Sequence, residues 1–183
     1  MSEAPSTSPP PIGDPRLAAL LQHWLSVRNG KAMPARRDVD PSRIPAVLAY
    51  LFIYDYHADT DRFFCRLAGE EIFAAAGVHG ARRFLEELFV PPTLERVRAR
   101  YSRVVKTPVV IHTKGLMRVA SGYRIPGERL VLPLASDGST ADGLIGATIY
   151  RRNEAMSPMQ SMKAPLADEV PFAVPPPGGF TIR

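Results

Sequence analysis

Apolar residues recur with a helical spacing near the start of the chain. Leu17, Leu20, Leu21 and Trp24 follow one another at intervals of three, one and three residues, which places them on one face of a helix. An Asp-Pro dipeptide directly before them supplies an N-cap acceptor and a proline at the first helical position. An Asn-Gly dipeptide after them favours a left-handed helix end. The pattern therefore predicts a helix that begins at residue 15 and ends before residue 29.

Five runs rich in β-branched, aliphatic and aromatic residues predict strands. Residues 51–56 and 63–68 are separated by a short Asp- and Thr-rich segment, an arrangement typical of a β-hairpin. Three later runs cover residues 109–117, 129–135 and 144–150. An Asp-Gly dipeptide between the last two is a strong turn signal.

Helical patterns lie between the second and third predicted strands. Residues 69–77 and 80–89 predict two short helices, and residues 93–106 predict a longer one. Strands interrupted by a block of helices argue for an antiparallel sheet with helices on one face. The predicted fold class is therefore α+β, with a preceding N-terminal helix.

Prolines divide the chain into three parts. The chain has 183 residues and 19 prolines, which concentrate at its two ends. Residues 1–13 and 151–183 show no sustained periodicity and offer too little apolar surface to offset chain entropy. We therefore expect a disordered N-terminal segment, a compact domain over residues 14–150, and a Pro-rich tail that is extended or disordered.

Several stretches, taken in order, resemble a bacterial single-domain PAS-like family. They are RRDVDPSRIPAVLAYLFIYDY, FFCRLAGEEIFAAAG, GARRF and LVLPLASDG, and the likeness covers about residues 17–150. The resemblance implies a five-stranded antiparallel sheet in the order 2-1-5-4-3, with a ligand or signal pocket between sheet and helices. It also implies a sensory or regulatory role without catalysis, in which the signal passes through contacts with a protein partner.

An apolar interior is expected between the sheet and the helical block. Strand alternation places every second residue of 63–68 on one face, and apolar helix residues would lie opposite. The two alternatives are a filled core and a cavity for a small apolar or aromatic ligand. The candidate lining comprises Phe63, Cys65, Leu67, Ile72, Phe73, Phe84, Leu88, Leu132 and Ile145.

A basic stripe follows one face of the predicted helix 93–106. Arg96, Arg100 and Arg103 are spaced by four and three residues, and the whole chain carries a net charge of +5. Such a face is either simply solvated or binds an anionic partner, namely a nucleotide second messenger, nucleic acid or an acidic protein surface. No aromatic residues interleave the stripe, which weakens the reading as a single-strand nucleic-acid binder. Binding of nucleic acid or an anionic nucleotide is the alternative function.

Catalysis, metals and cofactors find little support in the sequence. One cysteine and four scattered histidines give no metal-ligand spacing, and no serine lies in a G-x-S-x-G context. Glu70 and Glu71 are adjacent on a helix start and do not converge on one face. His79 alone lies near the place of a haem ligand, yet we expect a loop histidine. We therefore predict no enzyme activity, no metal and no cofactor.

The first helix is also a candidate for self-association. Its apolar stripe either packs on the chain's own sheet or pairs between subunits, and a homodimer through Leu17, Leu21 and Trp24 is the prediction. No apolar run is long enough to span a bilayer, and the first residues do not form a secretory signal. The expected location is therefore the cytoplasm, with no membrane partner.

Overall fold

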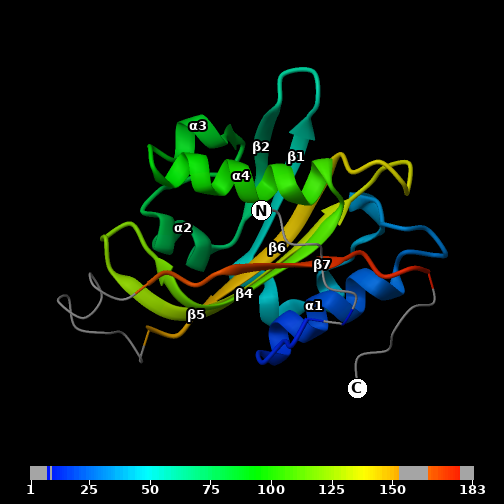
Figure 1. Ribbon diagram of the computed structural model, residues 1–183, viewed down its shortest axis with the longest axis horizontal. Helices are drawn as coiled ribbons and strands as arrows, with labels where there is room; N and C mark the ends of the chain where they lie inside the picture. The colour runs from blue at the N-terminus through cyan, green and yellow to red at the C-terminus, as the bar shows by residue number, and fades with distance from the viewer. Residues whose placement is uncertain (1–7, 9, 153–164, 178–183) are drawn as a thin grey trace.

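An antiparallel sheet of seven strands lies at the centre of the protein, in the order β3-β2-β1-β6-β5-β4-β7 (Figure 1). The structure is a computed structural model that describes residues 8, 10–152 and 165–177. Most of the predicted disordered segment 1–13 and much of the tail 151–183 lie outside these residues. The strands are β1 (Leu51–His57), β2 (Arg62–Ala68), β3 (Arg83–Phe84), β4 (Val109–Arg118), β5 (Arg124–Leu134), β6 (Gly143–Tyr150) and β7 (Glu169–Ala173).

The sheet has two more strands than the five that were predicted. Its central part, β2-β1-β6-β5-β4, has the expected order 2-1-5-4-3. The short strand β3 adds to the β2 edge, and β7 pairs antiparallel with β4 from Val109 to Thr113. β7 comes from the Pro-rich tail and contains Pro171. Proline cannot donate a backbone hydrogen bond to a neighbouring strand, which an edge strand such as β7 tolerates because it has a neighbour on one side only.

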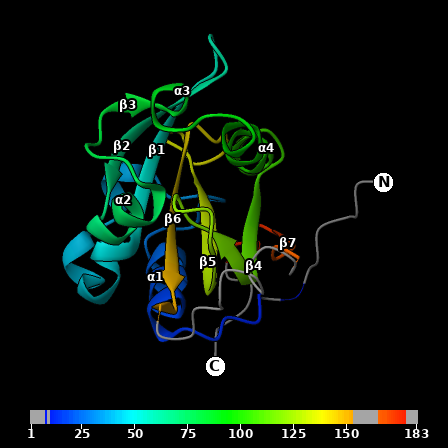
Figure 2. The same ribbon diagram turned by 90° about the vertical axis from the view of Figure 1, so that its left-hand side faces the viewer.

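Helices cover both faces of this sheet (Figures 1 and 2). α2, α3 and α4 lie on one side, and α1 lies on the other. No helix in the described part of the chain combines the length and apolar composition that a bilayer span requires. The helices are α1 (Pro15–Ser26), α2 (Glu70–Ala76), α3 (Leu85–Leu88) and α4 (Thr93–Lys106), with 3-10 turns η1 (Arg36–Asp38), η2 (Pro41–Arg43) and η3 (Pro45–Tyr50).

The apolar stripe of α1 packs against the chain's own sheet. Asp14 caps the helix by accepting a hydrogen bond from the backbone N–H of Arg16, as predicted. Leu17, Leu21 and Trp24 are at most 1% exposed, and the Trp24 indole N–H donates to the carbonyl of Pro133 in β5 at 2.8 Å. The stripe offered as a dimer surface is thus buried within one chain, because the sheet has a free face that needs covering. Leu17, Leu21 and Trp24 are therefore not available to form the predicted homodimer contacts.

Candidate ligand cavity

A cavity of about 670 Å³ lies between α4, α2 and the sheet. Its floor is formed by β4, β5 and β6, and the segment leading into β7 closes one side. The main contributors to its walls are Phe52, Tyr54, Ile72, Ala75, Ala76, Leu88, Thr93, Arg96, Val97, Arg100, Tyr101, Thr113, Leu116, Met117, Arg118, Arg129, Thr148, Tyr150, Leu166, Asp168 and Glu169. A volume of this size is within the range of about 300–1,000 Å³ typical of small-molecule sites.

A row of polar side chains crosses the floor of the cavity. Thr113 and Thr148 are the direct cross-strand partners of Arg129 on either side, so all three point to the same face of the sheet. The Nε of Arg129 donates to Thr148 Oγ1 at 2.8 Å. Thr113 is only 3% exposed, and its Oγ1 has no hydrogen-bond partner among the described residues.

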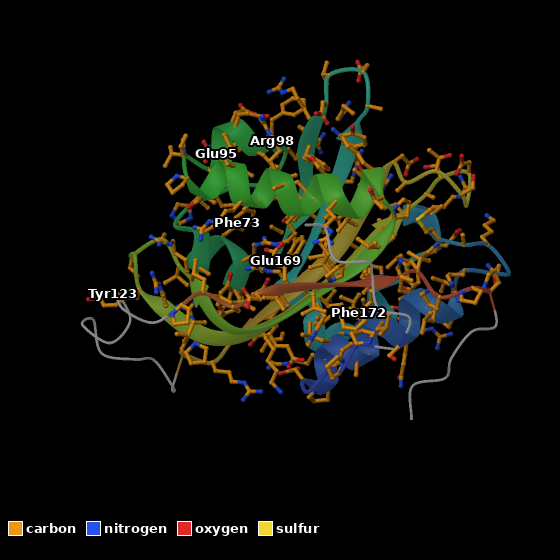
Figure 3. All side chains as sticks on the ribbon, viewed as in Figure 1. Phe73, Glu95, Arg98, Tyr123, Glu169 and Phe172 are labelled. Carbon is orange, nitrogen blue, oxygen red and sulfur yellow. The ribbon has the colours of Figure 1, made fainter. Side chains whose placement is uncertain are left out.

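One face of α4 supplies the roof of the cavity. Arg96 and Arg100, and likewise Val97 and Tyr101, are four residues apart on this helix and line the cavity together. The Arg100 guanidinium forms an ion pair with Glu169 of β7, and its side chain is 11% exposed. Figure 3 shows Glu169 on the sheet side of α4, with Arg98 and Glu95 on its outer side.

Positive charge predominates in the lining. Four arginines and two carboxylates contribute, which gives a net charge of +2. Arg118 and Asp168 are exposed, whereas Arg96, Arg100, Arg129 and Glu169 are partly buried.

The pKa values of the roof arginines reflect this crowding. Burial lowers the pKa of Arg96, and the nearby charge of Arg118 lowers it further. Burial and the charge of Arg129 lower the pKa of Arg100 even though Glu169 opposes them. Burial and the neighbouring positive charges thus both disfavour the charged forms of Arg96 and Arg100.

An aromatic cluster lies beside the arginines, because Tyr101 follows Arg100 on α4 and the charges of Arg100 and Arg129 both act on it. The rings of Tyr54 and Tyr101 have centroids 4.9 Å apart, and the Phe52 ring stacks on Tyr101 at 6.0 Å. Burial raises the pKa values of Tyr54 and Tyr101, so both phenols remain neutral at physiological pH. The cavity thus combines charged side chains with apolar and aromatic walls.

The family comparison agrees with this architecture. A family model described as PAS domain matches residues 13–149. The chain belongs to the PAS domain family. A search among curated proteins finds no match to the sequence. Since PAS domains are generally sensory, the family indicates a sensory or regulatory module.

Two of the nine residues predicted to line the pocket of this PAS domain do so, Ile72 and Leu88. Phe63 and Cys65 face the same side of the sheet but lie in the packed core, where Phe63 contacts the ring of Tyr101 at a centroid distance of 5.7 Å. The aromatic cluster separates them from the cavity. The interior between the sheet and the helices is thus a filled core around Phe63 and Cys65 and a cavity beneath α4.

A β-bulge displaces a third predicted residue. The pairing of β1 with β2 shifts between Ile53 and Tyr54, which pair with Leu67 and Cys65. Arg66 is the extra residue, and an extra residue reverses the alternation of sides. Leu67 is therefore 41% exposed instead of facing the helices.

The remaining predicted lining residues point elsewhere. Leu132 and Ile145 are cross-strand partners, and they lie on the face of the sheet that α1 covers. Phe84 packs on Phe64 at the β3 edge, with ring centroids 5.2 Å apart. Phe73 is half-buried on α2 and does not line the cavity.

The predicted basic stripe is divided by the fold. Arg96 and Arg100 line the cavity, whereas Arg103 does not. The stripe is therefore not a continuous solvent-facing surface for nucleic acid, because two of its three members point toward the sheet. The two predicted features, an interior pocket and an anion-binding helix face, instead coincide in one cavity.

Sequence reasoning missed the polar floor and the contribution of the tail. Thr148 is a polar residue within the otherwise apolar strand β6, and a polar residue buried in a strand is a signal that could have been used. Thr113 gave a weaker signal, because it stands between His112 and Lys114, and so did Arg129, which follows Glu128. Glu169 had no such signal, because its place depends on β7 joining the sheet. His79, the residue weighed as a haem ligand, is exposed and does not line the cavity. The described residues contain no group of three potential metal ligands among His, Cys, Asp and Glu.

Proposed function

We propose that this PAS domain is a regulatory sensor that binds a small organic molecule in the cavity between α4 and the sheet. The observation that carries the proposal is the cavity itself, because packed interiors rarely leave a space of this size unused. Its walls combine apolar side chains with a few polar groups, as ligand sites generally do.

The signal would leave through α4 and β7. Both elements line the cavity on one side and reach the surface on the other. A ligand that contacts them favours the packing in which those contacts form, and can shift the population only by its difference in affinity between packings. A protein partner that contacts the exposed side of α4, which carries Glu95 and Lys106, would respond to that shift.

The lining supports binding in preference to catalysis. Within the described residues, no His, Cys or Lys side chain lines the cavity. Arginine remains protonated at physiological pH and serves as a donor instead of a base. We therefore propose a regulatory role and a protein partner, without a resident cofactor.

A matched pair of variants on α2 tests the proposal. Ala76 lines the cavity, whereas Ala74 lies exposed on the same helix outside the lining. A compound from a metabolite library that raises the melting temperature of the wild type should lose its effect in Ala76→Phe and keep it in Ala74→Phe. Equal loss or equal retention in both variants would place the binding site elsewhere.

A further inference from the structure

We propose that the ligand is a small organic anion with an apolar body, whose acid group is bound by Arg96, Arg129 and the hydroxyl of Thr113. This inference rests on the proposed function, since it specifies the chemistry that the cavity accepts. Three independent features of the cavity carry it.

The first feature is the availability of Arg129. Its Nε is engaged by Thr148, which fixes the orientation of the planar guanidinium. No described residue accepts a hydrogen bond from its terminal nitrogens, and no described carboxylate lies within ion-pairing distance of it. An oriented guanidinium with two free terminal nitrogens is suited to bind a carboxylate or phosphate with two hydrogen bonds.

The second feature is the arrangement of charge on the roof. Glu169 already neutralises Arg100, so this arginine is occupied. Arg96 lies one helical turn before Arg100 and also faces the cavity, without an ion pair to any described carboxylate. Arg96 and Arg129 therefore give the interior two uncompensated positive charges on opposite walls.

The third feature is the hydroxyl of Thr113. It is buried, has no partner among the described residues, and belongs to a residue that lines the cavity next to Arg129. An unpaired buried hydroxyl destabilises a protein, whereas an oxygen acceptor on a ligand would satisfy it. Two guanidinium groups and a hydroxyl form a complete donor set for one acid group.

The rest of the cavity determines the body of the ligand. Ile72, Val97, Leu116 and Met117 line it, and Phe52, Tyr54 and Tyr101 add aromatic surface. A compact, fully charged molecule would leave this apolar surface without contacts. The match is an amphipathic acid, with its charge at the arginines and its hydrocarbon or aromatic part against these apolar side chains.

Two related dyes test whether binding in the cavity depends on the negative charge of the ligand. 8-Anilinonaphthalene-1-sulfonate is an amphipathic anion, and N-phenyl-1-naphthylamine has the same aromatic skeleton without the sulfonate. Fluorescence titration of the full chain should give tighter binding of the sulfonate than of the neutral dye, with one site per chain. Ala76→Phe should abolish this binding, and Ala74→Phe should preserve it.

Arginine variants locate the charge recognition. Arg96→Gln and Arg129→Gln should each raise the Kd of the sulfonate about tenfold or more, because a hydrogen bond to a charged group is lost. Neither variant should change the Kd of the neutral dye. Arg98→Gln removes the same charge from the outer side of α4, where Arg98 pairs with Glu86. It should change neither affinity, which excludes a general effect of net charge.

The outcomes separate this inference from the proposed function. If both dyes bind equally and Ala76→Phe blocks both, the cavity binds ligands but does not read charge, and the inference is wrong while the proposed function stands. If neither dye binds, or Ala76→Phe leaves binding intact, the cavity is not the binding site, and both fail.

Discussion

Arg100 of α4 and Glu169 of β7 form an ion pair across the boundary between helix and sheet edge. The two residues are 69 positions apart in the sequence. Because Arg100 is 11% exposed and lines the cavity, Glu169 occupies a place where a ligand carboxylate could also bind. An anionic ligand of the kind proposed above would therefore compete with Glu169 for Arg100.

This competition gives a prediction for Glu169→Gln. Removing the carboxylate frees Arg100, so the affinity for 8-anilinonaphthalene-1-sulfonate should rise several-fold. The same change leaves a mostly buried guanidinium without its counterion and should lower the free energy of unfolding by about 1–3 kcal/mol. Dye titration and urea denaturation measure the two effects, and weaker dye binding would show that Glu169 assists the anion instead of competing with it.

The unpartnered hydroxyl of Thr113 should lower the stability of the free protein and strengthen the binding of an anion. Thr113→Val keeps the shape and removes the unsatisfied group, so the unliganded protein should gain about 1 kcal/mol of stability. Binding of the sulfonate dye should weaken. Thr148→Val is the matched control, since Thr148 accepts a hydrogen bond from Arg129 and its loss should destabilise. A destabilised Thr113→Val would mean that the hydroxyl has a partner in the free protein.

The stability of the fold should depend on a buried pair, His112 and Glu128, on the opposite face of the sheet. His112 Nε2 lies 2.8 Å from Glu128 Oε1, and the side chains are 4% and 1% exposed. Glu128 also accepts a hydrogen bond from the Gly13 backbone N–H at 2.7 Å, just before α1. His112→Phe should therefore destabilise by about 3–5 kcal/mol, measured by urea denaturation. His112→Gln keeps a side-chain N–H that can donate to Glu128 and should destabilise less than His112→Phe.

The turn between β5 and β6 predicts a pH dependence. Backbone N–H groups of Ser139 and Thr140 lower the pKa of Asp137 to about 2 from its ordinary value of 3.8. A lowered folded-state pKa adds stability above pH 3.8 that is lost as the pH falls through 2. Asp137→Ala should be less stable than the wild type at pH 7, with the difference shrinking between pH 4 and pH 2.

The control for this turn is Asp137→Asn, whose side chain still accepts hydrogen bonds but does not titrate. Its difference from the Ala variant should stay constant over the same pH range in thermal unfolding. A difference between the wild type and Asp137→Ala that is constant with pH would contradict the assigned role of the carboxylate.

Elements governed by local sequence were predictable. α1 begins at its Asp-Pro signal, the β1–β2 hairpin follows its aromatic runs, and Gly138 takes a positive φ of 83° at the predicted Asp-Gly turn. Each of these depends on neighbouring residues alone. The central strand order also followed, through the resemblance to the PAS family.

Features that depend on distant partners were not predictable. The bulge that exposes Leu67 arises from the register with β1, which the alternation within β2 does not report. From the sequence, a solvated position was the ordinary expectation for Arg100, because charged residues usually lie at the surface. It turns inward toward the cavity, where Glu169 arrives from the tail. The candidate site was therefore recovered only in part, through Ile72, Leu88, Arg96 and Arg100.

The tail strand has a consequence for how such sensors diversify. Leu166, Asp168 and Glu169 form one side of the binding chamber, yet they lie beyond the stretch that the family shares, residues 13–149. The Arg28 guanidinium donates hydrogen bonds to the carbonyls of Pro175 and Pro176, at the end of the same segment. A change in this segment would therefore alter one wall of the cavity without altering any residue that matches the family model.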